Sequence, residues 1–144
     1  MTALARFPLW VAALWWGSLS TVGFLVVPLL FNYLPTPAVA GTMAAKLFAA
    51  QSWLSVACGL LLLMITRSNM PSAHKQRAQA AIVFIVLGML LALLSEFAVA
   101  PRIVARENLR VWHAVGSAMY LLQWLCATAT LSKLMPPINP ANQV

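Results

Sequence analysis

Hydrophobic residues fill four long stretches of the chain, and most of its charged residues lie in the short connections between them. The stretches run from Phe7 to Leu34, Ala38 to Thr66, Ala78 to Ala100 and Val111 to Leu134. A hydrocarbon core about 30 Å thick needs roughly 20 helical residues at about 1.5 Å each, and every stretch is long enough. Strands of a membrane barrel would be about ten residues long and would alternate in polarity, which these stretches do not. The pattern predicts an all-α, polytopic membrane protein with a bundle of four transmembrane helices.

The connections between the predicted helices have the sequences LPTP, RSNMPSAHKQR and PRIVARENLR. None of them is long enough to form a domain, so residues 1–134 are expected to be one transmembrane domain. The Pro- and Asn-rich residues 135–144 are expected to form a disordered tail.

A short sequence repeat links the first and third helices. The pattern F-x-V-x-P occurs at Phe24–Pro28 and again at Phe97–Pro101, each toward the end of its stretch. Chance is one explanation. The other is that the chain consists of two helical hairpins in tandem, related by an axis along the membrane normal.

Composition agrees with a membrane protein. The chain is 62% hydrophobic and 8% charged, with a mean hydropathy of +0.88, whereas soluble domains are about 45–50% apolar and about 25% charged. The net charge of +7 would suit nucleic acid, but the nine Lys and Arg residues lie in short clusters between apolar stretches. We therefore expect a lipid bilayer around the chain and no nucleic-acid partner.

The distribution of Lys and Arg indicates an orientation. The side with both termini carries Arg6, Arg67, Lys75, Arg77 and Lys133, and the other side carries Lys46, Arg102, Arg106 and Arg110. This excess, with the compact middle connection, favours a bacterial inner-membrane protein whose termini are both cytoplasmic. The sequence AVAG at Ala38–Gly41 is similar to a signal-peptidase site, but the apolar run before it is about 25 residues, against 7–15 in signal peptides. The first helix is therefore expected to be retained.

Glu96 is one of only two carboxylates in the chain, and it lies at the end of a long apolar run. Gly88, Ala92 and Ala100 precede and follow it at four-residue spacing, which is typical of the close-packing face of a membrane helix. An ionisable group that faces the bundle interior suggests a function. The alternative is a carboxylate near the headgroups that only orients its helix. We expect Glu96 to be ionised and paired with Arg110 or His113, or otherwise with Lys46.

Other polar residues are predicted at the same depth, toward the outer face. We call the following set the outer polar cluster: Lys46, Glu96, Arg102, Arg110 and His113. Gln51 lies just over one turn deeper than Lys46, and residues 116, 117 and 120 share the helical face of His113. The inner half is expected to hold almost no polar residues. The cluster is either a binding site or an arrangement that only orients helices. Taken by itself, His113 is more simply interpreted as a histidine at the membrane interface.

No complete catalytic or metal-binding motif is present. Ser117 lies one turn from His113 but lacks a third group to orient the base. Glu96 and His113 supply only two metal ligands, the seven methionines serve equally well for packing, and His74 is badly placed for haem. Cys58 and Cys126 are expected to be small buried residues. We therefore expect no enzyme activity, cofactor or metal.

Aromatic and small residues predict the packing. Trp10, Tyr33 and Trp112 fall near the interfaces. Four tryptophans lie deeper and are expected in the core: Trp15, Trp16, Trp53 and Trp124. The packing face predicted for the first helix is the stripe Gly17, Thr21, Phe24 and Pro28.

The segment Phe31–Phe48, FNYLPTPAVAGTMAAKLF, resembles the F-x-x-L-P…G…K-L-F segment of domain-of-unknown-function family 4149, which includes eukaryotic transmembrane protein 205. Pro101-Arg102 resembles the family's P-R after its third helix, and His113 with Ser117 resembles the residues that open its last helix. The resemblance implies four membrane helices without an established reaction. The resemblance also implies that six positions are important: Pro35, Gly41, Lys46, Pro101, Arg102 and His113. The packing stripe predicted for the first helix adds Pro28 as a structural position. Glu96 has no clear counterpart. The eukaryotic member is associated with resistance to platinum drugs, which implies export or trafficking.

Two functions are consistent with the sequence. The first is binding or transport of an ion or small solute through the outer polar cluster. The alternative is an accessory membrane subunit that docks a partner protein without transport or catalysis. A four-helix bundle is narrow, so transport would need a homo-oligomer or another membrane protein.

The predicted orientation can be tested with reporter fusions. Fusions after Gln143 and within 68–72 should report the cytoplasm, and a fusion at Thr36 should report the outside. A cytoplasmic signal at Thr36 would reverse the orientation.

Overall fold

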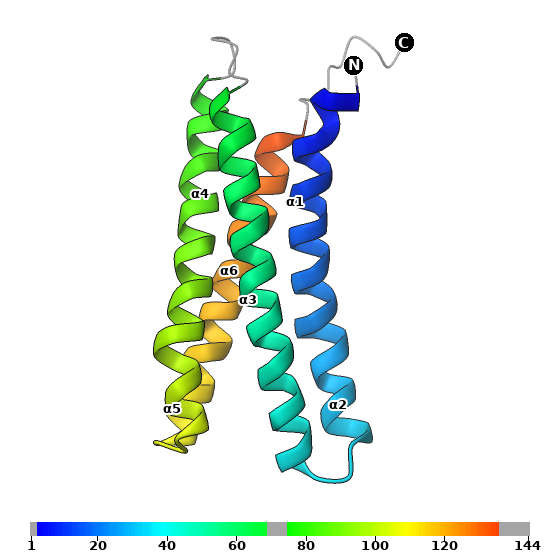
Figure 1. Ribbon diagram of the computed structural model, residues 1–144, viewed down its shortest axis with the longest axis vertical. Coiled ribbons are helices and arrows are strands. Elements are labelled where there is room, and N and C mark those ends of the chain that lie inside the picture. The colour runs from blue at the N-terminus through cyan, green and yellow to red at the C-terminus, as the bar shows by residue number, and fades with distance from the viewer. Residues whose placement is uncertain (1–2, 69–74, 136–144) are drawn as a thin grey trace.

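A computed structural model describes the backbone of residues 3–68 and 75–135, and the side chains of residues 6–66 and 76–135. The described chain is all-helical, and its four long apolar helices pack as a bundle (Figure 1). In order they are α1 (Ala3–Thr21), η1 (Val22–Val26) and α2 (Val27–Tyr33); α3 (Pro37–Ser68); α4 (Lys75–Leu94), η3 (Ser95–Val99) and α5 (Ala100–Val104); and α6 (Leu109–Leu134). The predicted four-helix bundle is confirmed. The third helix is longer than predicted, because it continues past Pro101 to Val104.

The helices alternate in direction, so the bundle has two distinct ends. The turns 34–36 and 105–108 lie at one end, which we call the turn end and which is at the bottom of Figure 1. The beginning of α1 and the end of α6 lie at the other, which we call the terminal end. Residues 136–144 of the predicted tail lie outside the described residues, as does His74.

Each copy of the F-x-V-x-P repeat forms the same irregularity. The π-helical segments η1 and η3 end two residues before Pro28 and Pro101. A proline in a helix lacks an N–H, and its ring clashes with the carbonyl group four residues earlier. Those carbonyls belong to Phe24 and Phe97, inside the two π segments, where the wider turn relieves the clash. The repeat therefore has a structural basis at equivalent places in the two hairpins.

The core is built from large side chains on three helices. Trp15 and Leu19 of α1, Leu62 of α3 and Ile85 of α4 are each 0% exposed. The buried face of α1 therefore contains Trp15 and Leu19, and the predicted stripe from Gly17 to Pro28 is wrong. Its members Thr21, Phe24 and Pro28 are exposed.

Two of the predicted packing positions around Glu96 are correct. Gly88 and Ala92 are both buried in α4. The four tryptophans predicted in the core differ in their exposure. Trp15 is fully buried, and Trp16 and Trp124 are partly buried, whereas Trp53 is 56% exposed. The prediction that Trp53 lies in the core is therefore wrong, because its ring lies at the surface, where it meets the exposed Phe97 ring of η3.

Gly88 lies on the face of α4 that meets the Trp15 ring. A Cβ atom at this position would lie 2.7 and 2.8 Å from two ring carbons of Trp15, and 3.4 Å from Cβ of Cys126. Because Trp15 is fully buried, its ring has little room to shift. The glycine therefore leaves the space that the Trp15 ring occupies against α4.

We expect Gly88→Ala to lower the free energy of unfolding by about 1–3 kcal/mol through overpacking. Thermal unfolding of the purified protein in detergent measures this. Gly17→Ala is the matched control, because no atom lies within 4 Å of its added Cβ. Equal midpoints for the two variants would contradict the close contact.

Candidate functional site

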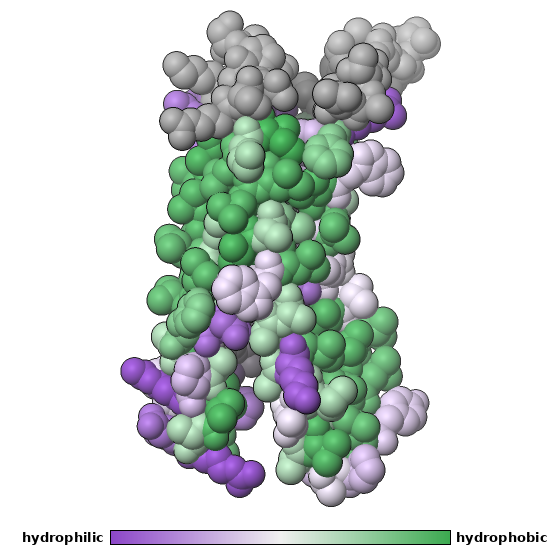
Figure 2. Space-filling model, in the orientation of Figure 1, coloured by the Kyte–Doolittle hydropathy of each residue, from purple (hydrophilic) through white to green (hydrophobic). Residues whose placement is uncertain are grey.

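The turn end is divided between the tips of the two hairpins. There α2 packs on α3, and α5 packs on α6. The space-filling view shows a notch between the two tips, open at the turn end, with hydrophilic residues around it (Figure 2). Above it, the visible surface is mostly apolar, as expected for a face in contact with lipid.

The outer polar cluster lies on this half of the bundle. Lys46 of α3, Arg102 of α5, and Arg110 and His113 of α6 have exposed side chains, while Glu96 of η3 is half-buried. Among the described side chains, Glu96 makes no salt bridge or hydrogen bond. The predicted pairing of Glu96 with Arg110, His113 or Lys46 is therefore absent from this structure, and the cluster does not form a compact ionic site.

Arg102 contacts an aromatic ring rather than a carboxylate. Its guanidinium carbon lies 4.3 Å from the centre of the Trp112 ring, a cation–π contact that joins α5 to α6. Between these residues, the turn 105–108 is tight, with positive φ at Arg106 (55°) and Asn108 (37°). This turn also presents Glu107, the second carboxylate, which the sequence interpretation did not use.

The residues singled out by the family resemblance have separate structural roles. Pro35 lies in the turn between α2 and α3. Next to it, the Thr36 hydroxyl accepts a hydrogen bond from the Val39 N–H (3.3 Å) and so caps α3. Gly41 has no atom within 4 Å of an added Cβ, so it is not a close-packing position. Neither Pro35 nor Gly41 is part of the notch chemistry.

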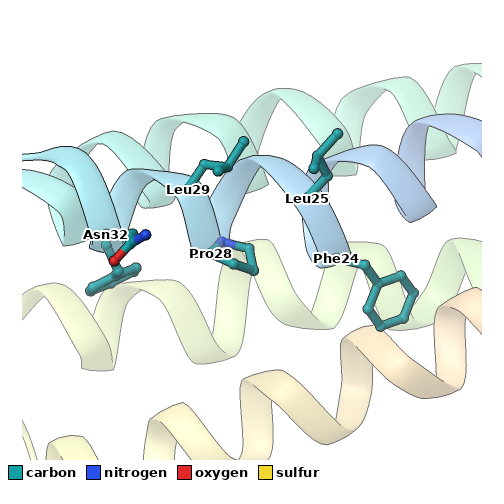
Figure 3. A pocket seen from close by; sticks show the side chains of 6 residues that line it. Phe24, Leu25, Pro28, Leu29 and Asn32 are labelled. Carbon is teal, nitrogen blue, oxygen red and sulfur yellow. The ribbon is translucent and has the colours of Figure 1, made fainter.

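A shallow apolar depression covers the last turns of the first helix before the turn end. Its lining residues are Phe24, Leu25, Pro28, Leu29, Phe31 and Asn32 (Figure 3). The Phe24 ring points toward α6, where it meets Trp124 edge to face at 5.5 Å. The depression is lined by one helix only and offers a single polar side chain, Asn32.

A ladder of partly buried hydrogen bonds joins α1 to α6. Its three rungs are Trp16 Nε1–H to Thr128 Oγ1 at 2.9 Å, Trp124 Nε1–H to Ser20 Oγ at 2.9 Å, and Tyr120 O–H to the Leu19 carbonyl at 2.8 Å. The side chains recur about one turn apart on both helices, so antiparallel packing brings them into register. We call this set the α1–α6 ladder.

Tyr120 also packs tightly against its neighbours. A Cβ added to Gly23 would clash with its ring, and its ring centre lies 5.2 Å from that of Phe48 on α3. The phenol therefore brings three helices together at the start of η1.

Two glutamines lie near the middle of the membrane spans. Gln51 of α3 is 4% exposed and donates to Ser18 Oγ (3.0 Å) and Ser55 Oγ (3.4 Å). Gln123 of α6 is 2% exposed, but its Nε2 has no partner among the described residues. The expectation that polar residues would be nearly absent beyond the outer half is therefore wrong, as buried Ser55, Thr66 and Thr130 also show.

The ladder and Gln123 were missed by the sequence interpretation, which looked for charge and named Gln51 only as a polar residue below Lys46. One usable signal was present: Trp16 with Ser20, and Trp124 with Thr128, are spaced by four residues in two apolar stretches. Tryptophan and hydroxyl residues at that spacing can supply hydrogen bonds between membrane helices.

The described residues offer few side chains that could bind a metal ion or react as thiols. Within residues 3–68 and 75–135, no three or more His, Cys, Asp or Glu residues lie close enough to hold a metal ion. Cys58 and Cys126 are both buried and free, as the sequence interpretation expected.

Comparisons with known proteins gave one match. The profile of a family described as Domain of unknown function (DUF4149) matches residues 10–112. These residues include most of the first helix, all of α3, α4 and α5, and the beginning of α6. No curated protein and no solved structure matched.

The ladder predicts a stability effect for one hydroxyl group. We expect Tyr120→Phe to lower the free energy of unfolding by about 0.5–1.5 kcal/mol, because the Leu19 carbonyl loses its donor. Thermal unfolding in detergent is the measurement. Tyr33→Phe, at a 78% exposed residue, should leave the midpoint unchanged. A Tyr120→Phe chain as stable as the parent would show that this rung contributes nothing.

Proposed function

The chain belongs to the DUF4149 family, and on that premise we propose that it is a small multi-pass membrane protein that binds an anionic solute in the notch at the turn end. The notch faces the outside of a bacterial inner membrane, with both termini in the cytoplasm. The chain acts as a binding protein and catalyses no reaction.

One observation carries this proposal: the exposed cations of the turn end are not neutralised. Lys46, Arg102, Arg106 and Arg110 are exposed and form no salt bridge within the described chain. Glu96 and Glu107 are the only carboxylates of the chain, so positive charge is in excess here. A recess with one sign of charge concentrates ions of the opposite sign. Lysine and arginine also form strong charge-assisted hydrogen bonds with oxyanions.

The packing of the other half supports binding rather than passage through a single chain. Trp15, Leu19, Leu62 and Ile85 fill the bundle interior and are 0% exposed. A solute that reached the middle of the bundle from the notch would meet this apolar core. Transport would require a second copy of the chain or another membrane protein to complete a pathway.

One observation favours the alternative, an accessory subunit that docks a partner protein. Trp53 and Phe97 are 56% and 66% exposed, and their rings meet at 6.3 Å on the apolar surface. Such a pair could pack against a partner's helix. In that case, substitutions of the two rings would alter co-purification, while substitutions in the notch would not.

Anion binding can be tested with inorganic phosphate and sulfate as probes on the detergent-solubilised chain, by isothermal titration calorimetry. We expect Lys46→Gln and Arg110→Gln to weaken binding roughly tenfold each, because each removes a charge-assisted hydrogen bond. Glu96→Gln should bind as well as the parent or more tightly, because it removes a negative charge.

Arg6→Gln and Lys133→Gln are the matched controls. Both remove an exposed cation at the terminal end and should leave the affinity unchanged. The proposal fails if the parent binds neither anion, or if the controls weaken binding as much as the notch variants do.

A further inference from the structure

Two hydrogen-bond donors in the middle of the bundle have no acceptor. The indole N–H of Trp15, a residue 0% exposed, and the side-chain amide of Gln123, 2% exposed, are both buried and unpartnered among the described residues. Inside a membrane, an unsatisfied polar group costs several kcal/mol. Two such donors in one small bundle call for an explanation.

The Trp15 ring approaches the helix that carries Gln123. A Cβ built at Gly88 would lie 2.8 Å from Cζ2 of Trp15, the carbon next to the ring junction that bears Nε1, and 3.4 Å from Cβ of Cys126. Gln123 lies less than one turn before Cys126, and both are buried on the same face of α6. The Trp15 ring therefore reaches the contact between α4 and α6 within about one turn of Gln123, and Gly88 and Ala92 contribute little side-chain volume there.

Aromatic rings separate this place from the notch. Both α3 and α6 begin at the turn end, so Phe48 and Tyr120 each lie three residues nearer to it than Gln51 and Gln123. The two rings meet at 5.2 Å, and the Tyr120 hydroxyl is held by the Leu19 carbonyl. Toward the terminal end, the core residues Leu62 and Ile85 complete the enclosure.

We infer that Trp15 and Gln123 hold a small hydrogen-bond acceptor, a water molecule or a halide ion, in a buried site behind the Phe48–Tyr120 pair. Both groups donate through N–H, so a cation is the wrong ligand for them. Neither carboxylate of the chain lies on α1 or α6 beside them, so no protein charge competes with an anion. A small polar site with two donors suits an ordered water, which typically makes two to four hydrogen bonds. This site does not depend on anion binding in the notch.

A pair of identical substitutions at the two glutamines tests the site. Gln51→Leu removes an amide with known partners, and it sets the size of the loss expected for a satisfied group. We expect Gln123→Leu to lower the midpoint of thermal unfolding by a comparable amount, about 2–4 °C. If the Gln123 amide were truly unpaired, leucine would keep or raise the midpoint, because it removes a buried polar group without loss of a bond. An equal or higher midpoint with unchanged helix content therefore overturns the inference.

The unmodified chain provides a test that does not depend on the variants' folding. The indole N–H of Trp15 is observed by NMR in the ¹⁵N-labelled protein and assigned by its loss in Trp15→Phe. A nuclear Overhauser effect to water, with no response to chloride, identifies water. A shift of this signal when sodium gluconate is replaced by sodium chloride identifies a halide. If neither effect is observed, the donor has no partner and the inference is wrong.

Discussion

Lipid tails neither donate nor accept hydrogen bonds, so a polar atom inside the bilayer must find its partner within the bundle or in a small molecule or ion bound there. This constraint explains the helical fold, and it also explains which helices pack together. The α1–α6 ladder pairs two indole N–H groups with two hydroxyl oxygens and a phenol with a backbone carbonyl. Gln51 ties α3 to α1 through Ser18 in the same way. Apolar packing around Trp15 gives the bundle its density, while the hydrogen bonds specify which helices are neighbours and in what register.

The two π segments connect this well-packed region to the more open turn end. Each lies just before a proline, where a regular helix would place the ring against a carbonyl. Beyond them, α2 and α5 pack mainly within their own hairpins, and the notch lies between their tips (Figure 2). The same local irregularity in both hairpins therefore coincides with the change from a closed bundle to two separate tips. The cations proposed to bind anions lie on the open side of that boundary.

The sequence was sufficient for the helices but not for their faces. Four apolar stretches of membrane length leave few other folds, so the four-helix bundle was predicted correctly, although the third helix continues past Pro101 to Val104. The buried face of α1 was not, because in an apolar stretch Thr21 and Phe24 look as suitable for packing as Trp15 and Leu19. Charge directed attention to Glu96, yet the buried polar structure depends on neutral groups such as Gln51 and Tyr120. Their partners lie far away in the sequence, so their pairing follows from the helix register, which a single sequence does not contain. The repeat around Pro28 and Pro101 was recognised, but the π segments became evident only with the backbone.

The α1–α6 ladder also bears on how the protein is made. Its indole-to-hydroxyl rungs join residues 112 and 104 positions apart, the first and last helices of the domain. During synthesis the first helix enters the membrane well before α6 leaves the ribosome, so Trp16 and Ser20 spend that interval without their partners. Hydrophobicity alone must keep the early helix in the bilayer, and the nascent bundle stays incompletely joined until α6 arrives. The fourth helix of the bundle is therefore the one that joins α1 to its hydrogen-bond partners, and a chain that stops before it would leave an inserted bundle without this ladder.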